Sequence, residues 1–141
     1  MTANIARVVD FFENLSPAKL QELSQIYAPH ARFKDPFNDV VGTEAIQKIF
    51  EHMYVQVYNP SFIIQERVVD RHQCFLTWKF HFYFKSFKPS HQQCILGASH
   101  LVFDEQGLVT LHRDYWDAAE ELYEKIPMLG GFMRWLKQRA G

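Results

Sequence analysis

Apolar residues recur at helical spacing in the first third of the chain. They fall every third or fourth position across residues 5–12, which predicts an amphipathic helix. Ser16-Pro17 is typical of a helix start, because serine caps the first turn and proline fits its first position. We expect this second helix to place Tyr27 on its apolar side and to end before Pro29.

The pattern then predicts a short strand and a third helix. Residues 31–35 alternate as a strand does, and Pro36 ends the run. Gly42-Thr43 opens a helix that Asn59-Pro60 would close. The apolar stripe of this helix is continuous. It consists of Ile46, Ile49, Phe50, Met53, Tyr54 and Val57.

After this helix the apolar residues follow a period of two, which indicates strands. The expected strands are 62–70, 74–87, 93–104 and 108–116, with a turn at 104–107 between the last two. Helices followed by a meander of strands predict an α+β fold. We expect a cone-shaped curved sheet, mixed or antiparallel as in cystatin-like α+β barrels, that wraps the N-terminal helices and leaves one mouth open as a ligand cavity.

The end of the chain is expected to be helical. A helix is predicted over 117–125, followed by a short amphipathic segment over 129–139. The domain boundaries are therefore 1–125 for the cone and 126–141 for an extension packed on the same domain or on a partner. The extension combines apolar and basic residues, so it fits a lid over the cone mouth, a dimer contact or a membrane-surface helix.

The last strand carries the strongest candidate chemistry. Side chains alternate along a strand, so His112, Asp114 and Trp116 share one face. If that face lines a hollow, burial raises the pKa of a carboxyl group and suits it to moving protons near neutrality. The structural alternatives are that Asp114 pairs with Arg113 and that the histidine is a buried group satisfied by a carboxylate.

The longest strand carries an aromatic face. Alternation places its large rings on one side and three polar or amphipathic residues on the other. The rings are Trp78, Phe80, Phe82 and Phe84, and the opposite side holds Lys79, His81 and Tyr83. The aromatic face fits a wall for a lipophilic ligand, to which Phe50 and Tyr54 of the third helix would add. Ordinary core packing explains the same pattern equally well.

Composition narrows the function classes. Apolar residues make up 48% and aromatic residues 16% of the 141 residues, enough for one domain with a large core or a lipophilic cavity. A net charge of −1 argues against nucleic acid as the main partner. Cys74 and Cys94 form no CxxC pair, and no signal peptide or membrane span is present, so a cytoplasmic location is expected.

The sequence predicts neither a metal nor a cofactor. The seven histidines include no His-x-x-x-His pair. Glycine-rich phosphate loops and serine-centred nucleophile motifs are absent.

Four segments, in this order, resemble one known superfamily. They are residues 27–37, Gly42 with the helix after it, residues 103–107 and Tyr115-Trp116-Asp117. Together they are similar to the nuclear-transport-factor-two-like cone fold, most of all to its SnoaL-like polyketide cyclase and ketosteroid isomerase branches. The resemblance covers residues 5–120 and implies dimerisation through the outer sheet face, where Lys79, His81 and Tyr83 would lie.

The ketosteroid isomerase branch implies a general base at Asp35. Aspartate before proline is also a common turn residue, so this side chain fits a turn cap as well. The oxyanion donors of that branch fall near Phe11 or Phe12, which cannot donate, and near Ser99, a weak neutral donor. Steroid isomerisation by that mechanism is therefore disfavoured.

The SnoaL-like branch implies an acid/base aspartate on the last strand close to a pocket histidine, as Asp114 and His112 would be. The leading hypothesis is a cofactor-free enzyme of isomerase, cyclase or hydrolase type acting on a lipophilic, carbonyl-bearing substrate. Asp35 would assist, and Trp116 with the aromatic strand would hold the apolar body. The alternative is a non-catalytic module that binds a lipophilic ligand or a protein, with membrane contact through 129–139.

Overall fold

The computed structural model describes residues 1–86 and 89–118. The helices of this part are α1 (Thr2–Glu13), the 3₁₀ helix η1 (Ala18–Gln25) and α2 (Thr43–Gln56). The strands are β1 (Tyr27–Lys34), β2 (Asp39–Val41), β3 (Val57–Asp70), β4 (Gln73–Phe84), β5 (Gln93–Phe103) and β6 (Val109–Tyr115).

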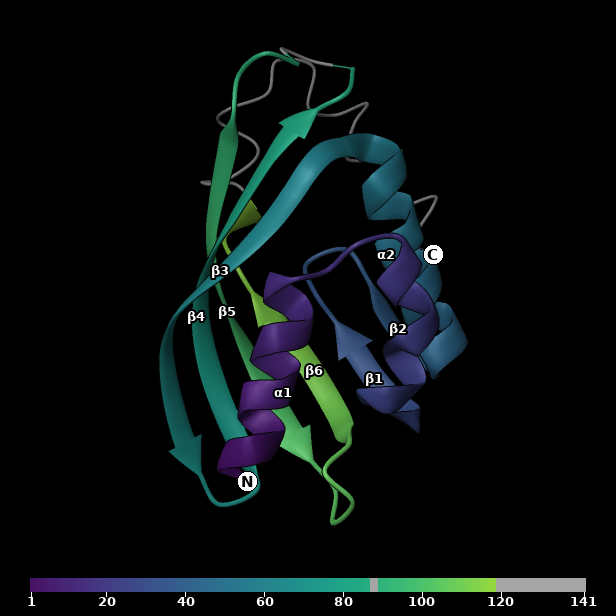
Figure 1. The fold of residues 1–141 in the computed structure, drawn as a ribbon, viewed down its shortest axis with the longest axis vertical. Helices are drawn as coiled ribbons and strands as arrows, with labels where there is room; N and C mark the ends of the chain where they lie inside the picture. Colours follow the sequence, from purple (N-terminus) through teal and green to yellow (C-terminus); the bar gives the residue numbers. More distant parts are fainter. Residues whose placement is uncertain (87–88, 119–141) are drawn as a thin grey trace.

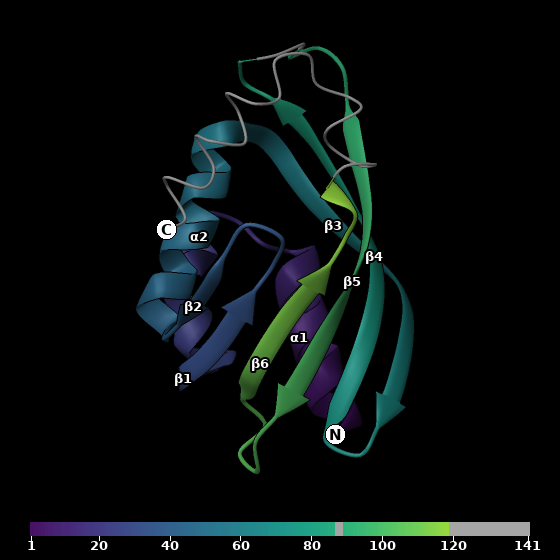
Figure 2. The same ribbon diagram turned by 180° about the vertical axis from the view of Figure 1, so that it is seen from behind.

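One curved sheet contains all of these strands, in the order β2-β1-β6-β5-β4-β3. The pair β1 and β6 is parallel and the other pairs are antiparallel, so the sheet is mixed. Both α-helices lie on its concave side (Figure 1), and the opposite face is left open by the described elements (Figure 2). The expected α+β cone is confirmed.

The core lies between α1 and the concave face of the sheet. Val8 of α1 and Ala31 of β1 are completely buried. Arg7 fixes this helix to two loops, because its guanidinium donates to the carbonyl oxygens of Gln25 and Gly107, each at 2.6 Å. A second apolar cluster is formed by residues of β3, β4 and β5. Its buried members are Val57, Trp78, Phe82, Phe84 and Ile95.

The prediction that Tyr27 lies on a helix is wrong. The second helix is a short 3₁₀ helix that ends at Gln25, and β1 begins at Tyr27. Pro29 lies inside β1 without breaking it. The pairing with β6 shifts between Tyr27 and Arg32, so the missing N–H of the proline costs no ladder bond there.

The third helix also ends earlier than predicted. α2 stops at Gln56, and Val57 opens β3 opposite Phe84 instead of closing the helical stripe. Asn59, with φ of 49°, and Pro60 fall where the β3–β4 register shifts, which is where a sheet tolerates such residues. Strand β2 was not predicted, since three residues give no periodic signal.

In the described ranges no helix is long and apolar enough to cross a bilayer. The predicted helix over 117–125, the segment over 129–139 and the extension over 126–141 lie almost wholly outside the described residues. They remain expectations from the sequence.

Candidate functional site

Strand β6 presents His112 and Asp114 on the concave face, as their spacing predicted. In the β5–β6 register His112 is paired with Leu101 and Asp114 with Ser99. The Nε2 atom of His112 lies 2.6 Å from Oδ1 of Asp114. The imidazole is buried, and the carboxylate side chain is 16% exposed. The two groups therefore form one hydrogen-bonded pair at the edge of the core.

Arg113 does not pair with this carboxylate. It lies on the opposite face of β6, with its guanidinium 4.8 Å from the ring centre of Tyr115. The alternative that Asp114 is neutralised by its sequence neighbour is thus not what the structure shows.

Tyr27 extends the pair into the core. Its hydroxyl lies 2.6 Å from Nδ1 of His112, and the two rings stack with centres 5.9 Å apart. The tyrosine is 1% exposed, and burial raises the pKa of its phenol well above the usual value, with Asp114 adding to the rise. Phe12 and Phe33 meet the imidazole edge-on, so both ring nitrogens are used and the ring is held on its faces and edges.

A second chain of hydrogen bonds reaches Asp114 from the other side. The indole N–H of Trp78 donates to Oγ of Ser99 at 2.9 Å, and the serine hydroxyl donates to Oδ1 of Asp114 at 2.5 Å. Gly97 makes this possible: a Cβ there would lie 2.4 Å from the indole ring. The predicted donor Ser99 is therefore present and already engaged with the carboxylate.

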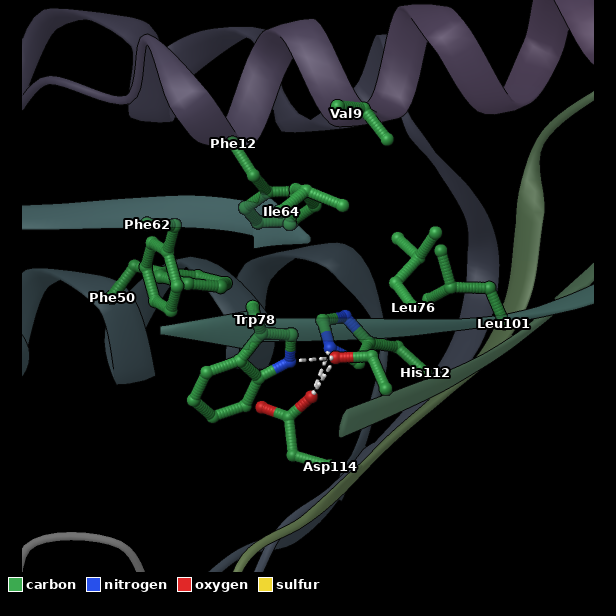
Figure 3. Close-up of a pocket in the computed structure, with 11 residues that line it drawn as sticks. Val9, Phe12, Phe50, Phe62, Ile64, Leu76, Trp78, Leu101, His112 and Asp114 are labelled. Carbon is green, nitrogen blue, oxygen red and sulfur yellow. Dashed lines mark hydrogen bonds and ion pairs between the residues drawn. The ribbon is translucent and has the colours of Figure 1, made fainter. Parts of the chain in front are cut away.

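These groups form the polar end of a small apolar cavity. Its free volume is about 30 Å³, enough for one or two water molecules. Figure 3 shows Asp114 with one oxygen in the hydrogen bonds and the other turned away from them. The remaining lining is apolar. It comprises Val9, Phe12, Phe50, Phe62, Ile64, Leu76 and Leu101.

A larger open cleft of about 520 Å³ adjoins the carboxylate. Asp114 lines both the cleft and the small cavity, so this carboxylate borders the two spaces. Trp116 and Asp35 line the cleft, and Phe37 supports Trp116 with an edge-to-face contact at 5.4 Å. Asp114, Trp116 and Asp35, all chosen from the sequence, are therefore brought to one place.

Asp35 has the turn-capping role that the sequence allowed. Its Oδ1 accepts the backbone N–H groups of Phe37 and Asn38 at 2.9 and 2.7 Å. The side-chain amide of Asn38 donates to both carboxylate oxygens. Burial is the largest influence on this group and raises its pKa, with Asp114 adding to the rise and the hydrogen bonds opposing it.

The other predicted binding residues divide into two groups. Phe50 and Trp78 line the small cavity. Phe80 stacks on Phe62 and Phe82, in or against the second core cluster, which agrees with the core-packing interpretation. Tyr54 packs against the first cluster, and its hydroxyl is buried without a hydrogen-bond partner.

Helix α1 brings no donor to this cavity. Phe12 occupies the wall facing His112, and Phe11 is buried in the same core cluster. The lining residues of the cavity therefore include a carboxylate, an imidazole, an indole and a serine, but no tyrosine. Within residues 1–86 and 89–118 no group of three or more metal-ligand side chains is gathered.

Sequence reasoning missed Tyr27 and the wall residues Phe62 and Ile64. The available signal was a phenol in the apolar stripe of a predicted helix, since buried tyrosines usually find a hydrogen-bond partner. Identifying that partner required the parallel pairing of β1 with β6, which joins residues far apart in the sequence.

Comparison with known families agrees with this geometry. The model of the SnoaL-like domain matches residues 8–112, which include the second half of α1, the other two helices, most of the sheet and His112. The chain belongs to the SnoaL-like domain family. The match ends two residues before Asp114, so the role of that carboxylate rests on the structure. No curated protein matches the chain.

Solved structures share the fold at low sequence identity. An NTF2-like protein of unknown function from Burkholderia pseudomallei has a TM-score of 0.74 and 14% identity, covering 87% of this chain and 97% of its own. A protein from Shewanella denitrificans described as a SnoaL-like polyketide cyclase has a TM-score of 0.70 and 18% identity, with coverages of 88% and 99%. An LEH-like epoxide hydrolase from Mycobacterium tuberculosis has a TM-score of 0.68 and 12% identity, with coverages of 96% and 91%.

Proposed function

We propose that this SnoaL-like protein is a cofactor-free acid/base enzyme that acts on a lipophilic, carbonyl-bearing compound, with Asp114 as the group that exchanges protons with it. The observation that carries the proposal is how the two oxygens of this carboxylate are hydrogen-bonded. Oδ1 is held by His112 and Ser99, whereas no residue within 1–86 and 89–118 donates a hydrogen bond to Oδ2. An oriented carboxylate that borders both an apolar cavity and an open cleft is what a general base requires.

The proposed reaction begins with proton removal by the second carboxylate oxygen of Asp114. Oδ2 of Asp114 removes a proton from the carbon next to the carbonyl group, and the C–H electron pair moves into the carbonyl to give an enolate. Return of a proton to the carbon frame completes an isomerisation, and attack of the enolate carbon on a second carbonyl closes a ring. Asp35 lines the same cleft, and because burial raises its pKa it is suited to hold and deliver a proton there.

The dimensions constrain the substrate. A cavity of about 30 Å³ accepts at most a small apolar group, whereas the cleft of about 520 Å³ holds a ring system. We place the body of the substrate in the cleft against Trp116, with its reactive carbon over Asp114. The Shewanella neighbour described as a polyketide cyclase and the Mycobacterium epoxide hydrolase share this fold and carry the names of enzymes, which supports the proposal of an enzyme.

Deuterium exchange of 2-tetralone in heavy water tests the proposal. This bicyclic ketone has acidic protons beside its carbonyl group, and proton NMR measures their loss. We expect the wild type to exchange them above the buffer rate and Asp114→Asn to lower kcat/KM about a hundredfold. Asp70→Asn, a matched change at an exposed position on β3, should leave the rate unchanged.

The same experiment distinguishes the proposed enzyme from the alternative, a non-catalytic binding module. That alternative is favoured by the small cavity and by the phenylalanine that replaces a donor on α1. If wild type and Asp114→Asn both exchange at the buffer rate while 2-tetralone still changes the fluorescence of Trp78 and Trp116, the protein binds and does not catalyse. Wild-type exchange that survives in Asp114→Asn contradicts the assignment of the base.

We also propose that the protein forms a homodimer through the outer face of the sheet. The described elements leave this face open, and apolar side chains gather on it. They include Ile63, Val68, Phe75 and Leu96, each more than 40% exposed. Phe75 and Leu96 lie on β4 and β5 inside the sheet, and Ile63 and Val68 lie on the edge strand β3. Exposed apolar area of this kind is typical of a surface that another protein covers.

A further inference from the structure

Tyr27 is a polar side chain of the site that does not line the cavity and was not expected from the sequence. Its hydroxyl has a single described partner, Nδ1 of His112, at 2.6 Å. The imidazole in turn has Asp114 as its other partner. The direction of these hydrogen bonds decides which nitrogen of the imidazole carries the proton.

In the hydrogen-bonded series Tyr27–His112–Asp114, both hydrogen bonds require a donor that points toward Asp114. A phenol that is 1% exposed and has no other described acceptor leaves its proton unsatisfied unless it donates to Nδ1. At the other end, an ionised carboxylate only accepts, so Nε2 must carry a proton. Both conditions hold together when the imidazole is neutral and protonated on Nε2.

The phenol is suited to this fixed role. Burial and the nearby carboxylate both raise the pKa of Tyr27, so the hydroxyl keeps its proton across the physiological range. Stacking of the two rings and the edge-on contacts of Phe12 and Phe33 prevent the imidazole from turning over. The serine that donates from the other side receives the indole N–H of Trp78, so its own proton also points at the carboxylate.

We propose that Tyr27 is a positioning residue that holds His112 as the neutral Nε2–H tautomer, so that both hydrogen-bonded chains end on Oδ1 of Asp114 and leave Oδ2 as the basic oxygen. This inference rests on the proposed acid/base function of Asp114. It adds a residue that acts only through the imidazole. Without the phenol, the proton on the ring can move to Nδ1, and Nε2 then faces the carboxylate without a donor.

The test is a ¹⁵N NMR spectrum of the imidazole side chains, with exchange kinetics on the same samples. In the wild type at neutral pH we expect His112 to show a protonated Nε2 and an unprotonated Nδ1. In Tyr27→Phe we expect a mixture of tautomers and a tenfold fall in kcat for 2-tetralone exchange, with KM within twofold. The control Tyr58→Phe changes an exposed ring on β3 and should match the wild type in both measurements.

The outcomes are distinct. A wild-type spectrum with the proton on Nδ1, or with both nitrogens protonated, overturns the proposal even if Tyr27→Phe fails to fold. An unchanged tautomer in a folded Tyr27→Phe overturns it as well. If the wild type shows the expected tautomer and Tyr27→Phe shifts it, but neither protein exchanges 2-tetralone, the positioning role stands and the proposed catalytic function is what fails.

Discussion

At the scale of single residues, the site depends on how each oxygen of two carboxylates is used. Asp114 has one oxygen held by two donors and one left open. Asp35 accepts four hydrogen bonds, three of them on Oδ1, and is buried beside Asp114. The first is oriented for proton transfer, and the second combines a turn cap with a raised pKa. The two carboxylates should therefore respond differently to pH and to substitution.

Asp35→Asn should make the protein more stable relative to the wild type as the pH rises above about 4. Because the pKa of Asp35 is raised in the folded state, the stability linked to its proton is complete at low pH and is lost as the pH rises. Asparagine keeps an acceptor for Phe37 and Asn38, and its amide can donate to Asn38 Oδ1, which is buried without a partner.

Urea denaturation between pH 4 and 8 measures this difference. Asp39→Asn is the matched control with the opposite sign, because the hydrogen bond from Arg32 holds the pKa of Asp39 below its usual value. The stability it contributes is present at neutral pH and disappears as the pH falls. A stability difference for Asp35→Asn that does not grow with pH would show that this carboxyl group titrates normally.

At the scale of elements, the pairing of β4 and β5 sets the position of the indole. Trp78 lies opposite Gly97 in the register, and the glycine leaves room for the ring to lie against the strand. The indole N–H then reaches Ser99, two residues further along β5. A glycine inside a strand is unfavourable in itself, so its presence here has a packing reason.

Gly97→Ala should displace the indole, because the new Cβ would lie 2.4 Å from it. We expect a loss of about 1–3 kcal/mol from overpacking and a changed tryptophan emission spectrum as the bond to Ser99 breaks. Urea denaturation and fluorescence measure both effects. Ala98→Gly alters the opposite face of the same strand and should leave the emission spectrum unchanged. An unaltered spectrum in Gly97→Ala would mean that the ring is not held by this contact.

At the scale of the whole molecule, the two faces of the sheet have different roles. The concave face holds the helices, the core and the site, whereas no described element covers the convex face (Figure 2). Apolar side chains of the described strands are exposed on that convex face. Exposed apolar area on the convex face of the described sheet is the physical basis for the proposed dimer. Since the proposed interface and the candidate site lie on opposite faces, each can be tested separately.

Leu96→Lys should convert the dimer to a monomer. Leu96 is 51% exposed near the middle of the open face, and a lysine there would bury a charge between two copies. Sedimentation velocity measures the assembly state. Val55→Lys, at a 60% exposed position on α2, is the control and should remain dimeric. A wild-type protein that sediments as a monomer at micromolar concentration would contradict the proposed interface.

Much of the fold was accessible from the sequence because periodicity reports which face of an element is buried. The long strands and the shared face of His112 and Asp114 followed from a period of two. The 3₁₀ helix, the strand start at Tyr27 and the β3 bulge did not follow, since each depends on pairing with a distant strand. The link from Tyr27 to His112 was invisible for the same reason.

The candidate site also has one part that the sequence predicted and one part that it did not. Asp114 could be chosen because alternation along one strand is local, but the use of its two oxygens depends on residues from three other strands. Those partners are contributed by β1, β4 and β5. Local alternation correctly placed Phe80 and Phe82 on the inner face. Their packing in or against the second cluster depends on the three-dimensional arrangement of the sheet, which alternation does not give.

The ring opening of 5-nitrobenzisoxazole is a direct test of Asp114 as a base, because the reaction requires only that a base in an apolar site removes one proton from carbon. We expect the wild type to accelerate the reaction over buffer and Asp114→Asn to lower kcat/KM at least about a hundredfold, with Asp70→Asn unchanged. A wild type no faster than buffer, or an Asp114→Asn protein that keeps the wild-type rate, would contradict it.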